Sequence, residues 1–248
     1  MDPFSSAIQS QFSPIGVLGG SGPDAALNIC ASIVDQARKV LPETLRGDQT
    51  APLILLRSDP RLGASMNLSY NRPYVLNALI EGLDALSTNC EHIAIACNTL
   101  NLFGMDTTIR GKYPKVLWFQ DVLSEQMALF PGKQFDIYGV RSVVSAPYQY
   151  SPYRDIFLRA PDRVRGVDVS DMITEIKQGY VQCAQERFRE LLALSADRIA
   201  VLACTELALM NVNGDRKADN VIDMNVCVAE AIVQAARKRF SALSPSIP

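Results

Sequence analysis

The sequence predicts an α/β fold of two similar halves, each a parallel sheet covered by helices on both faces. Short runs that are apolar on nearly every residue alternate with longer segments of helical pattern, the order expected of βαβ units. The runs lack polar alternation, as strands buried on both faces do. The segment HIAIACNT, which contains Cys97, is echoed by RIAVLACTE, which contains Cys204, and the two cysteines lie 107 residues apart. This loose repeat indicates two related halves.

The apolar runs and the segments between them give the expected elements in chain order. The predicted strands are 15–19, 52–57, 92–97, 115–119, 135–140, 164–168, 198–203 and 220–223. The predicted helices are 23–40, 72–88, 170–195 and 225–240. Pro23 suits the first position of its helix, and Ser170 is expected to cap the third. The basic run 237–239 suits the end of the last helix.

Composition excludes several classes of protein. The chain has 248 residues, of which 48% are hydrophobic and 20% charged, as in ordinary globular proteins. The net charge is −2 and no basic stripe occurs, so we expect no nucleic-acid partner. The N-terminus lacks the pattern of a signal peptide. No apolar run reaches the roughly 18 residues of a membrane span, so we expect a cytoplasmic protein with no membrane partner.

The cysteines and the single histidine, His92, limit the chemistry. Six cysteines occur and none forms a C-x-x-C pair, so we expect no metal site. Without an export signal, the thiols are expected to stay reduced. With one histidine in the chain, imidazole is not the expected activator of a thiol.

Cys97 and Cys204 are the candidate catalytic residues. Each follows a predicted strand, and ligands of parallel α/β folds bind beyond the carboxyl ends of strands. Each precedes what looks like a helix start, where the N-terminus favours a thiolate. The alternative is two buried structural cysteines, but their matching settings favour function. The polar residues that follow the cysteines are Asn98, Thr99, Thr205 and Glu206.

The turn GGSGP at 19–23 joins the first strand to the first helix. Its glycines allow a tight turn, and the following helix N-terminus can hold an anion. The turn also fits a dinucleotide fingerprint, but Asp59, the candidate acidic partner, lies 39 residues after Gly20 instead of about 20. We therefore favour carboxylate binding, with Ser21 and Gly22 as binding residues.

These three motifs, in this order, resemble the aspartate/glutamate racemase superfamily over residues 15–240. The GG-x-GP turn and the Cys-Thr-Glu triplet are similar to the aspartate racemase branch, whereas glutamate racemases have Asp-Ser and Cys-Thr-His. Lys177 lies in a segment similar to one whose lysine approaches the active site in that branch. The sequence departs from the family pattern at 100–101, 139–145 and 223–225. These departures bear on side-chain specificity more than on reaction type.

The resemblance implies an amino-acid racemase that needs no pyridoxal phosphate or other cofactor and interconverts L- and D-aspartate. Cys97 and Cys204 would exchange the roles of thiol and thiolate. It further implies two pseudo-symmetric Rossmann-like domains with parallel sheets and the active site in the cleft between them. The expected bounds are 15–112 plus 219–248 for the first domain and 113–218 for the second. Related racemases are dimers, so a homodimer is expected.

Removal of an α-proton without a cofactor requires donors aimed at the developing charge. The candidate donors are Ser21, Asn98, Thr99 and Thr205. The side-chain carboxylate of the substrate would require a cation, and the candidates are Arg57, Arg61 and Lys177, each of which could instead be a solvated surface charge. The alternatives left open are a glutamate racemase, a maleate isomerase-like enzyme and an inactive carboxylate-binding module. Retention of both cysteines argues against the single-cysteine decarboxylases of the superfamily.

Overall fold

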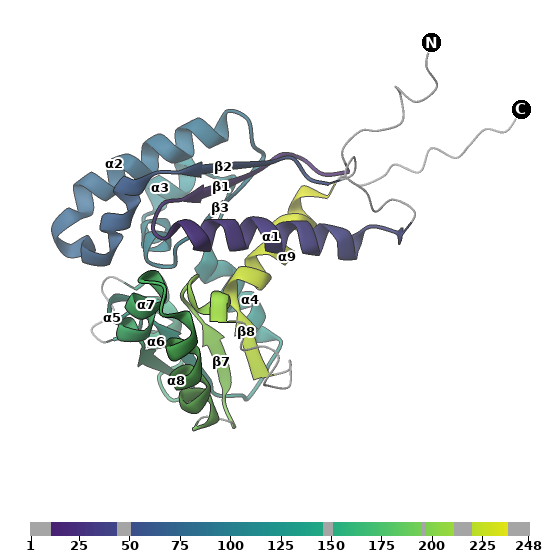
Figure 1. Ribbon diagram of the computed structural model, residues 1–248. Coiled ribbons are helices and arrows are strands. Elements are labelled where there is room, and N and C mark those ends of the chain that lie inside the picture. The colour runs from purple at the N-terminus through teal and green to yellow at the C-terminus, as the bar shows by residue number, and fades with distance from the viewer. Residues whose placement is uncertain (1–10, 44–50, 146–150, 195–196, 211–219, 238–248) are drawn as a thin grey trace, which may run out of the picture.

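The computed structural model describes residues 11–43, 51–145, 151–194, 197–210 and 220–237. They form two four-stranded sheets, and every strand pair in both sheets is parallel. Figure 1 shows the sheets as two bodies, with helices α1 (Pro23–Val40) and α9 (Met224–Ala236) running between them. The predicted α/β class with two parallel sheets is confirmed. Every helix in these ranges falls short of the length and apolarity that a membrane crossing requires.

The two sheets have the same strand order, β2-β1-β3-β4 in the first and β6-β5-β7-β8 in the second. The first consists of β1 (Ile15–Gly19), β2 (Ile54–Ser58), β3 (His92–Ile95) and β4 (Val116–Leu117). The second consists of β5 (Phe135–Gly139), β6 (Val164–Asp168), β7 (Ile199–Leu202) and β8 (Val221–Asp223). The strands β3 and β7 occupy equivalent places, so the two halves correspond as the repeat predicts.

Each sheet has one outer face and one face turned toward a shared interior. The outer face of the first sheet packs against α2 (Leu68–Ser87) and η4 (Thr99–Met105). The outer face of the second packs against α7 (Ser170–Lys177) and α8 (Val181–Ala193). The remaining helical segments are η3 (Pro60–Asn67), α3 (Thr107–Lys112), α4 (Phe119–Ala128), α5 (Arg141–Val144), α6 (Arg154–Arg159) and η5 (Leu207–Met210).

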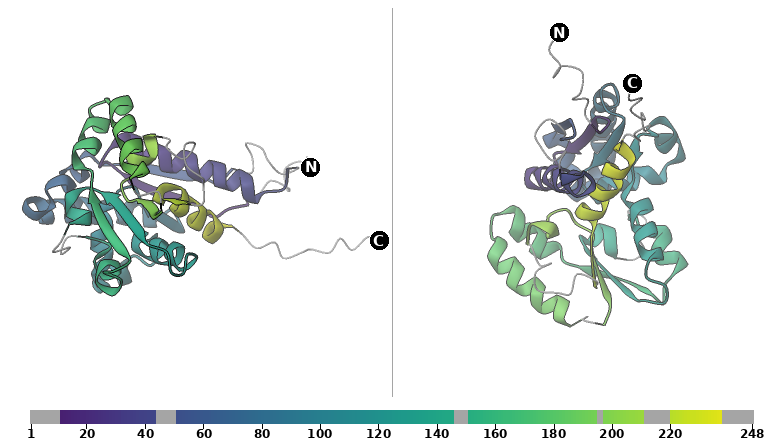
Figure 2. Two further views of the ribbon diagram at one scale, coloured as in Figure 1. Left: turned by 90° about the horizontal axis from the view of Figure 1, so that it is seen from below. Right: turned by 90° about the vertical axis from the view of Figure 1, so that its right-hand side faces the viewer.

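One hydrophobic core connects the two sheets. Its buried residues come from β1 and β3 of the first sheet and from β5 and β7 of the second, and α1, α4 and α9 bridge them. Helix α9 packs against α1 and crosses it obliquely in Figure 1; Figure 2 shows the same pair from two further sides. The described ends of the chain also meet, because Phe12 and Arg237 form an antiparallel bridge. The sheets are therefore held together by packing as well as by chain connections.

Three expectations about helices were wrong. The segment predicted as one helix over 170–195 forms two, α7 and α8, separated at Gly179, whose φ is 91°. Ser170 does not cap α7 but is its first residue, and its backbone N–H donates to Asp168 Oδ1 at 3.0 Å. The last helix ends at Ala236 rather than 240, and residues 238–240 lie outside the described residues.

The sheets divide the chain at different points from the expected domain bounds. Strand β4 lies beyond residue 112 and pairs with β3 in the first sheet. Strand β8 lies beyond residue 218 and pairs with β7 in the second, while α9 returns to α1. The bounds 15–112 plus 219–248 and 113–218 stay a prediction.

Candidate active site

Cys97 and Cys204 lie just beyond the carboxyl ends of two equivalent strands. Before Cys97, the N–H of Ala96 donates to the carbonyl of Leu18 at 2.8 Å, which continues the pairing of β3 with β1. Before Cys204, the N–H of Ala203 donates to the carbonyl of Tyr138 in the same way. The strand order reverses between β1 and β3 in the first sheet and between β5 and β7 in the second. Such switch points are where open parallel α/β folds bind ligands.

The segments after the cysteines are 3₁₀ helices and not the expected α-helices. Segment η4 begins at Thr99, and Asn98 precedes it without a side-chain capping bond. Segment η5 begins at Leu207, three positions after Cys204. The predicted support of a thiolate by an α-helix N-terminus is therefore wrong for both cysteines.

Cys204 is held in its protonated form. Its thiol donates to Glu206 Oε2 at 2.9 Å, and the hydroxyl of Thr205 donates to the same oxygen at 3.1 Å. Burial raises the pKa of Cys204 well above its ordinary value, and the charge of Glu206 raises it further. A buried thiolate next to a carboxylate is unfavourable. The structure therefore favours the thiol form of this cysteine and not the thiolate expected from the sequence.

Lys177 supplies the positive charge beside this pair. Its Nζ lies 3.1 Å from Glu206 Oε1, and the side chains are 27% and 4% exposed respectively. Burial opposes the charge of Lys177, but the carboxylate of Glu206 keeps its pKa above the ordinary value. The lysine is therefore a partly buried ammonium group beside the carboxylate that binds the Cys204 thiol.

Cys97 is tied to the turn after β1. Its Sγ lies 3.8 Å from Ser65 Oγ, which lies 2.8 Å from Ser21 Oγ. The side-chain amide of Asn101 donates to the carbonyl of Cys97 at 2.9 Å. All four residues are buried. The position of Cys97 therefore depends on both the first turn and the start of η4.

Tyr153 connects the second half of the chain to the loop of Cys97. Its hydroxyl donates to Asn98 Oδ1, and the tyrosine is fully buried. Burial raises its pKa well above the ordinary value. Asn98 Nδ2 is buried and has no hydrogen-bond partner among the described residues. The tyrosine thus fixes the amide of Asn98 so that a donor remains unused.

Two contacts bring the ends of the two sheets together. Gly22 has a φ of 104°, and a Cβ at this position would lie 2.5 Å from Glu206 Oε1, so the glycine permits this approach. The hydroxyl of Tyr153 reaches Asn98. The residue that binds the Cys204 thiol and the residue that follows Cys97 therefore each contact the other half of the chain.

The predicted arginines are in different states. Arg61 is engaged by two carboxylates, because its Nη2 lies 2.6 Å from both Asp59 Oδ2 and Glu81 Oε2. Arg57 lies at the end of β2, and its Nε is buried without a hydrogen-bond partner in the described ranges.

Thr99 is buried. In the same ranges no three His, Cys, Asp or Glu residues are grouped so that they could hold a metal ion.

Sequence reasoning missed Tyr153, Ser65 and Asn101 as site residues. Ser65 lies in η3, the segment after the end of β2, so a wider search beyond that strand end would have included it. Asn101 was noted only as a departure from the family pattern. Tyr153 precedes α6, and no local pattern marks it, because its partner Asn98 lies 55 residues away.

No protein-family model and no curated protein matches the sequence. Solved structures do match. The aspartate racemase of Picrophilus torridus is 21% identical, with 91% of this chain and 95% of that chain covered and a TM-score of 0.70. An aspartate racemase homologue of Pyrococcus horikoshii is 16% identical, with 91% of this chain and 100% of that chain covered and a TM-score of 0.64. The glutamate racemase of Campylobacter jejuni is 16% identical, with 92% of this chain and 88% of that chain covered and a TM-score of 0.60. The chain therefore has the fold of the aspartate/glutamate racemase superfamily, which its motifs resemble.

Proposed function

We propose that this chain is a cofactor-independent racemase that interconverts L- and D-aspartate, with Cys97 and Cys204 as its acid–base pair. Racemisation requires a base on one face of the α-carbon and an acid on the other. The observation that carries the proposal is the equivalent placement of the two cysteines at the ends of β3 and β7, with Glu206 bound to the Cys204 thiol and Tyr153 bound to Asn98 beside Cys97. The neighbouring solved structures named as racemases support the same reaction class.

The hydrogen bond from Cys204 to Glu206 supports an order of steps in which Cys204 is the acid. Cys97 is then the base that takes the α-proton. The resulting carbanion then receives the Cys204 proton on its other face. The turnover leaves Cys97 as thiol and Cys204 as thiolate, which is the form that the opposite enantiomer requires. Glu206 accepts a hydrogen bond from the thiol form of Cys204 and so stabilises that form. In that form, the enzyme acts on the enantiomer whose α-hydrogen faces Cys97.

Donors around the α-carboxylate would stabilise the enediolate-like carbanion. The unused Nδ2 of Asn98 is one such donor. The N-terminus of α1 is another, because Gly22 precedes it without a side-chain capping bond and a free helix N-terminus favours an anion. Arg57 is the better candidate for the side-chain carboxylate, since Arg61 already pairs with two acidic residues.

The direct test is proton exchange at the α-carbon. The protein is incubated with L-aspartate in deuterated water, and NMR follows loss of the Cα proton while chiral chromatography follows D-aspartate. We expect both signals, and a loss of at least about a hundredfold in Cys97→Ser and in Cys204→Ser, because each removes one acid–base group. Cys183→Ser, at an exposed thiol, is the matched control and should keep full activity.

The outcomes separate the alternatives. Full activity in either Cys97→Ser or Cys204→Ser contradicts the two-cysteine mechanism. Exchange with glutamate and none with aspartate would retain the mechanism and replace the substrate. Binding of both acids without exchange at either would favour the inactive carboxylate-binding module.

A further inference from the structure

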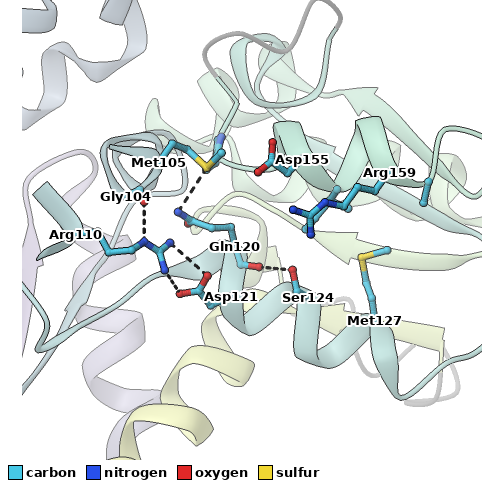
Figure 3. Close-up of a pocket in the computed structure, with 12 residues that line it drawn as sticks. Gly104, Met105, Arg110, Gln120, Asp121, Ser124, Met127, Asp155 and Arg159 are labelled. Carbon is cyan, nitrogen blue, oxygen red and sulfur yellow. Dashed lines mark hydrogen bonds and ion pairs between the residues drawn. The ribbon is translucent and has the colours of Figure 1, made fainter. Parts of the chain in front are cut away.

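A cavity of about 470 Å³ lies apart from the cysteine site. Its walls come from η4, α3 and α4 on one side and from α6 on the other (Figure 3). Neither Cys97 nor Cys204 lines it. Its volume lies in the range of small-molecule sites, and the proposed racemase reaction does not use it.

The charges at this cavity are of two kinds. Arg110 is already engaged, because it bonds to both carboxylate oxygens of Asp121 and to the carbonyl of Gly104. Asp155 and Arg159 lie one helical turn apart on α6, and Figure 3 shows both side chains projecting toward the cavity. The described residues provide neither side chain with a hydrogen-bond or ion-pair partner. The cavity thus offers one anion and one cation side by side.

The rest of the lining is mostly apolar or uncharged. The thioether of Met127 and the side chain of Ile156 face the cavity from α4 and α6, and Met105 and Ala160 extend this surface. Beyond Arg110, Asp121, Asp155 and Arg159, no charged residue contributes to the lining. A ligand with one positive group, one adjacent negative group and an apolar remainder is complementary to this arrangement.

We propose that this cavity binds an α-amino acid with an apolar side chain. The ammonium group pairs with Asp155, the carboxylate with Arg159, and the side chain packs between Met127 and Ile156. The two charged groups of an α-amino acid sit on one carbon, and residues one turn apart on a helix present their side chains at similarly short separation. The site has a different preference from the cysteine site, for which we propose an acidic substrate.

The cavity is physically linked to Cys97. Gln120, which lines the cavity and is 7% exposed, donates from Nε2 to the carbonyl of Asn101 at 3.3 Å. The amide of Asn101 in turn holds the carbonyl of Cys97 at 2.9 Å. Gln120 Oε1 is buried and has no hydrogen-bond partner in the described part of the chain. A rearrangement of this side chain could therefore give the oxygen a hydrogen bond. A ligand that shifts Gln120 would change the support of Cys97, and active-site ligands would change its affinity reciprocally.

Isothermal titration calorimetry of the full chain with L-methionine and L-leucine tests the site. We expect saturable binding with one site per chain. Methioninamide and N-acetylmethionine, which lack the carboxylate and the ammonium group respectively, should not bind detectably. Asp155→Asn and Arg159→Gln should each weaken binding about tenfold or more, because each removes a charge-assisted bond.

Two further variants make the test specific. Arg154→Gln removes the same charge from the same helix at a residue that does not line the cavity, so binding should be unchanged. Lys177→Ala alters the cysteine site and no residue of the cavity, so methionine should still bind, which separates this proposal from the racemase proposal. Absence of binding to the wild-type chain, equal binding in Arg159→Gln, or complete loss of binding in Lys177→Ala would each overturn the proposal. Circular dichroism establishes that each variant is folded.

Discussion

Replacing Tyr153 by Phe tests how the loop of Cys97 is held. The change keeps the ring and removes one hydroxyl from a fully buried position. That hydroxyl donates to Asn98 Oδ1, and the same amide carries the unused donor Nδ2. Without the tyrosine hydroxyl, the amide loses the contact that sets its orientation. We therefore expect effects on both stability and catalysis.

The magnitudes follow from the burial of both groups. A buried acceptor left without its donor costs about 1–3 kcal/mol. For a chain of this size, each 1 kcal/mol lowers Tm by roughly 2–4 °C. Complete loss of a donor to a developing anion costs roughly a hundredfold to a thousandfold in rate. Asn98 remains present in the variant but is no longer fixed, so we expect a fall in kcat/KM of about tenfold to a hundredfold.

The assay combines urea denaturation with racemase kinetics on aspartate. Tyr113→Phe is the matched control, because the Tyr113 hydroxyl donates to Asp84 Oδ1 at 2.8 Å in a contact that involves neither cysteine. This control should lose stability and keep kcat/KM. If Tyr153→Phe is destabilised but retains wild-type kcat/KM, the tyrosine is structural only. If both variants lose activity equally, a general loosening explains the result and the positioning argument is refuted.

Three other predictions concern close packing and charge near the site. Gly22→Ala would place a methyl group 2.5 Å from Glu206 Oε1 at a residue whose φ is 104°, so we expect a loss of about 1–3 kcal/mol by urea denaturation and at least about tenfold lower activity. Gly104→Ala would place Cβ 2.3 Å from the Trp118 ring, so calorimetry should show a lower Tm. Unchanged stability in either variant contradicts the corresponding contact. Glu206→Gln removes a charge that raises the pKa of Cys204. The alkaline rise in rate for the direction that uses Cys204 as base should therefore move to lower pH, and an unchanged pH–rate profile would exclude this coupling.

The fold was largely predictable because its central strands, β1, β3, β5 and β7, are buried on both faces. Such strands are continuous apolar runs, and HIAIAC and RIAVLAC stand out from their polar surroundings. Parallel strands require crossovers, so alternation with helices implies the sheet type. The break at Gly179 was missed although glycine inside a helical pattern is a known warning. The flanking apolar periodicity continued across it and concealed the turn.

The site was predictable only where chain position determines it. Cys97 and Cys204 follow strand ends, and the topology of parallel sheets makes such positions functional. Tyr153 and Ser65 reach the site through tertiary packing, which no local pattern encodes. The pKa of Cys204 was misjudged for a similar reason. The sequence argument weighed a helix N-terminus, whereas burial and the carboxylate of Glu206, two residues on, dominate in the structure.

The core that runs from β1 through α4 and α9 to β5 makes the halves mechanically interdependent. Neither half can be expressed alone without exposing the apolar surface that its neighbour covers, so fragments should remain unfolded until mixed. Strands β3 and β7, which lead to Cys97 and Cys204, both contribute to this interior. We therefore expect the two cysteines to be positioned when the chain folds rather than when the proposed substrate arrives.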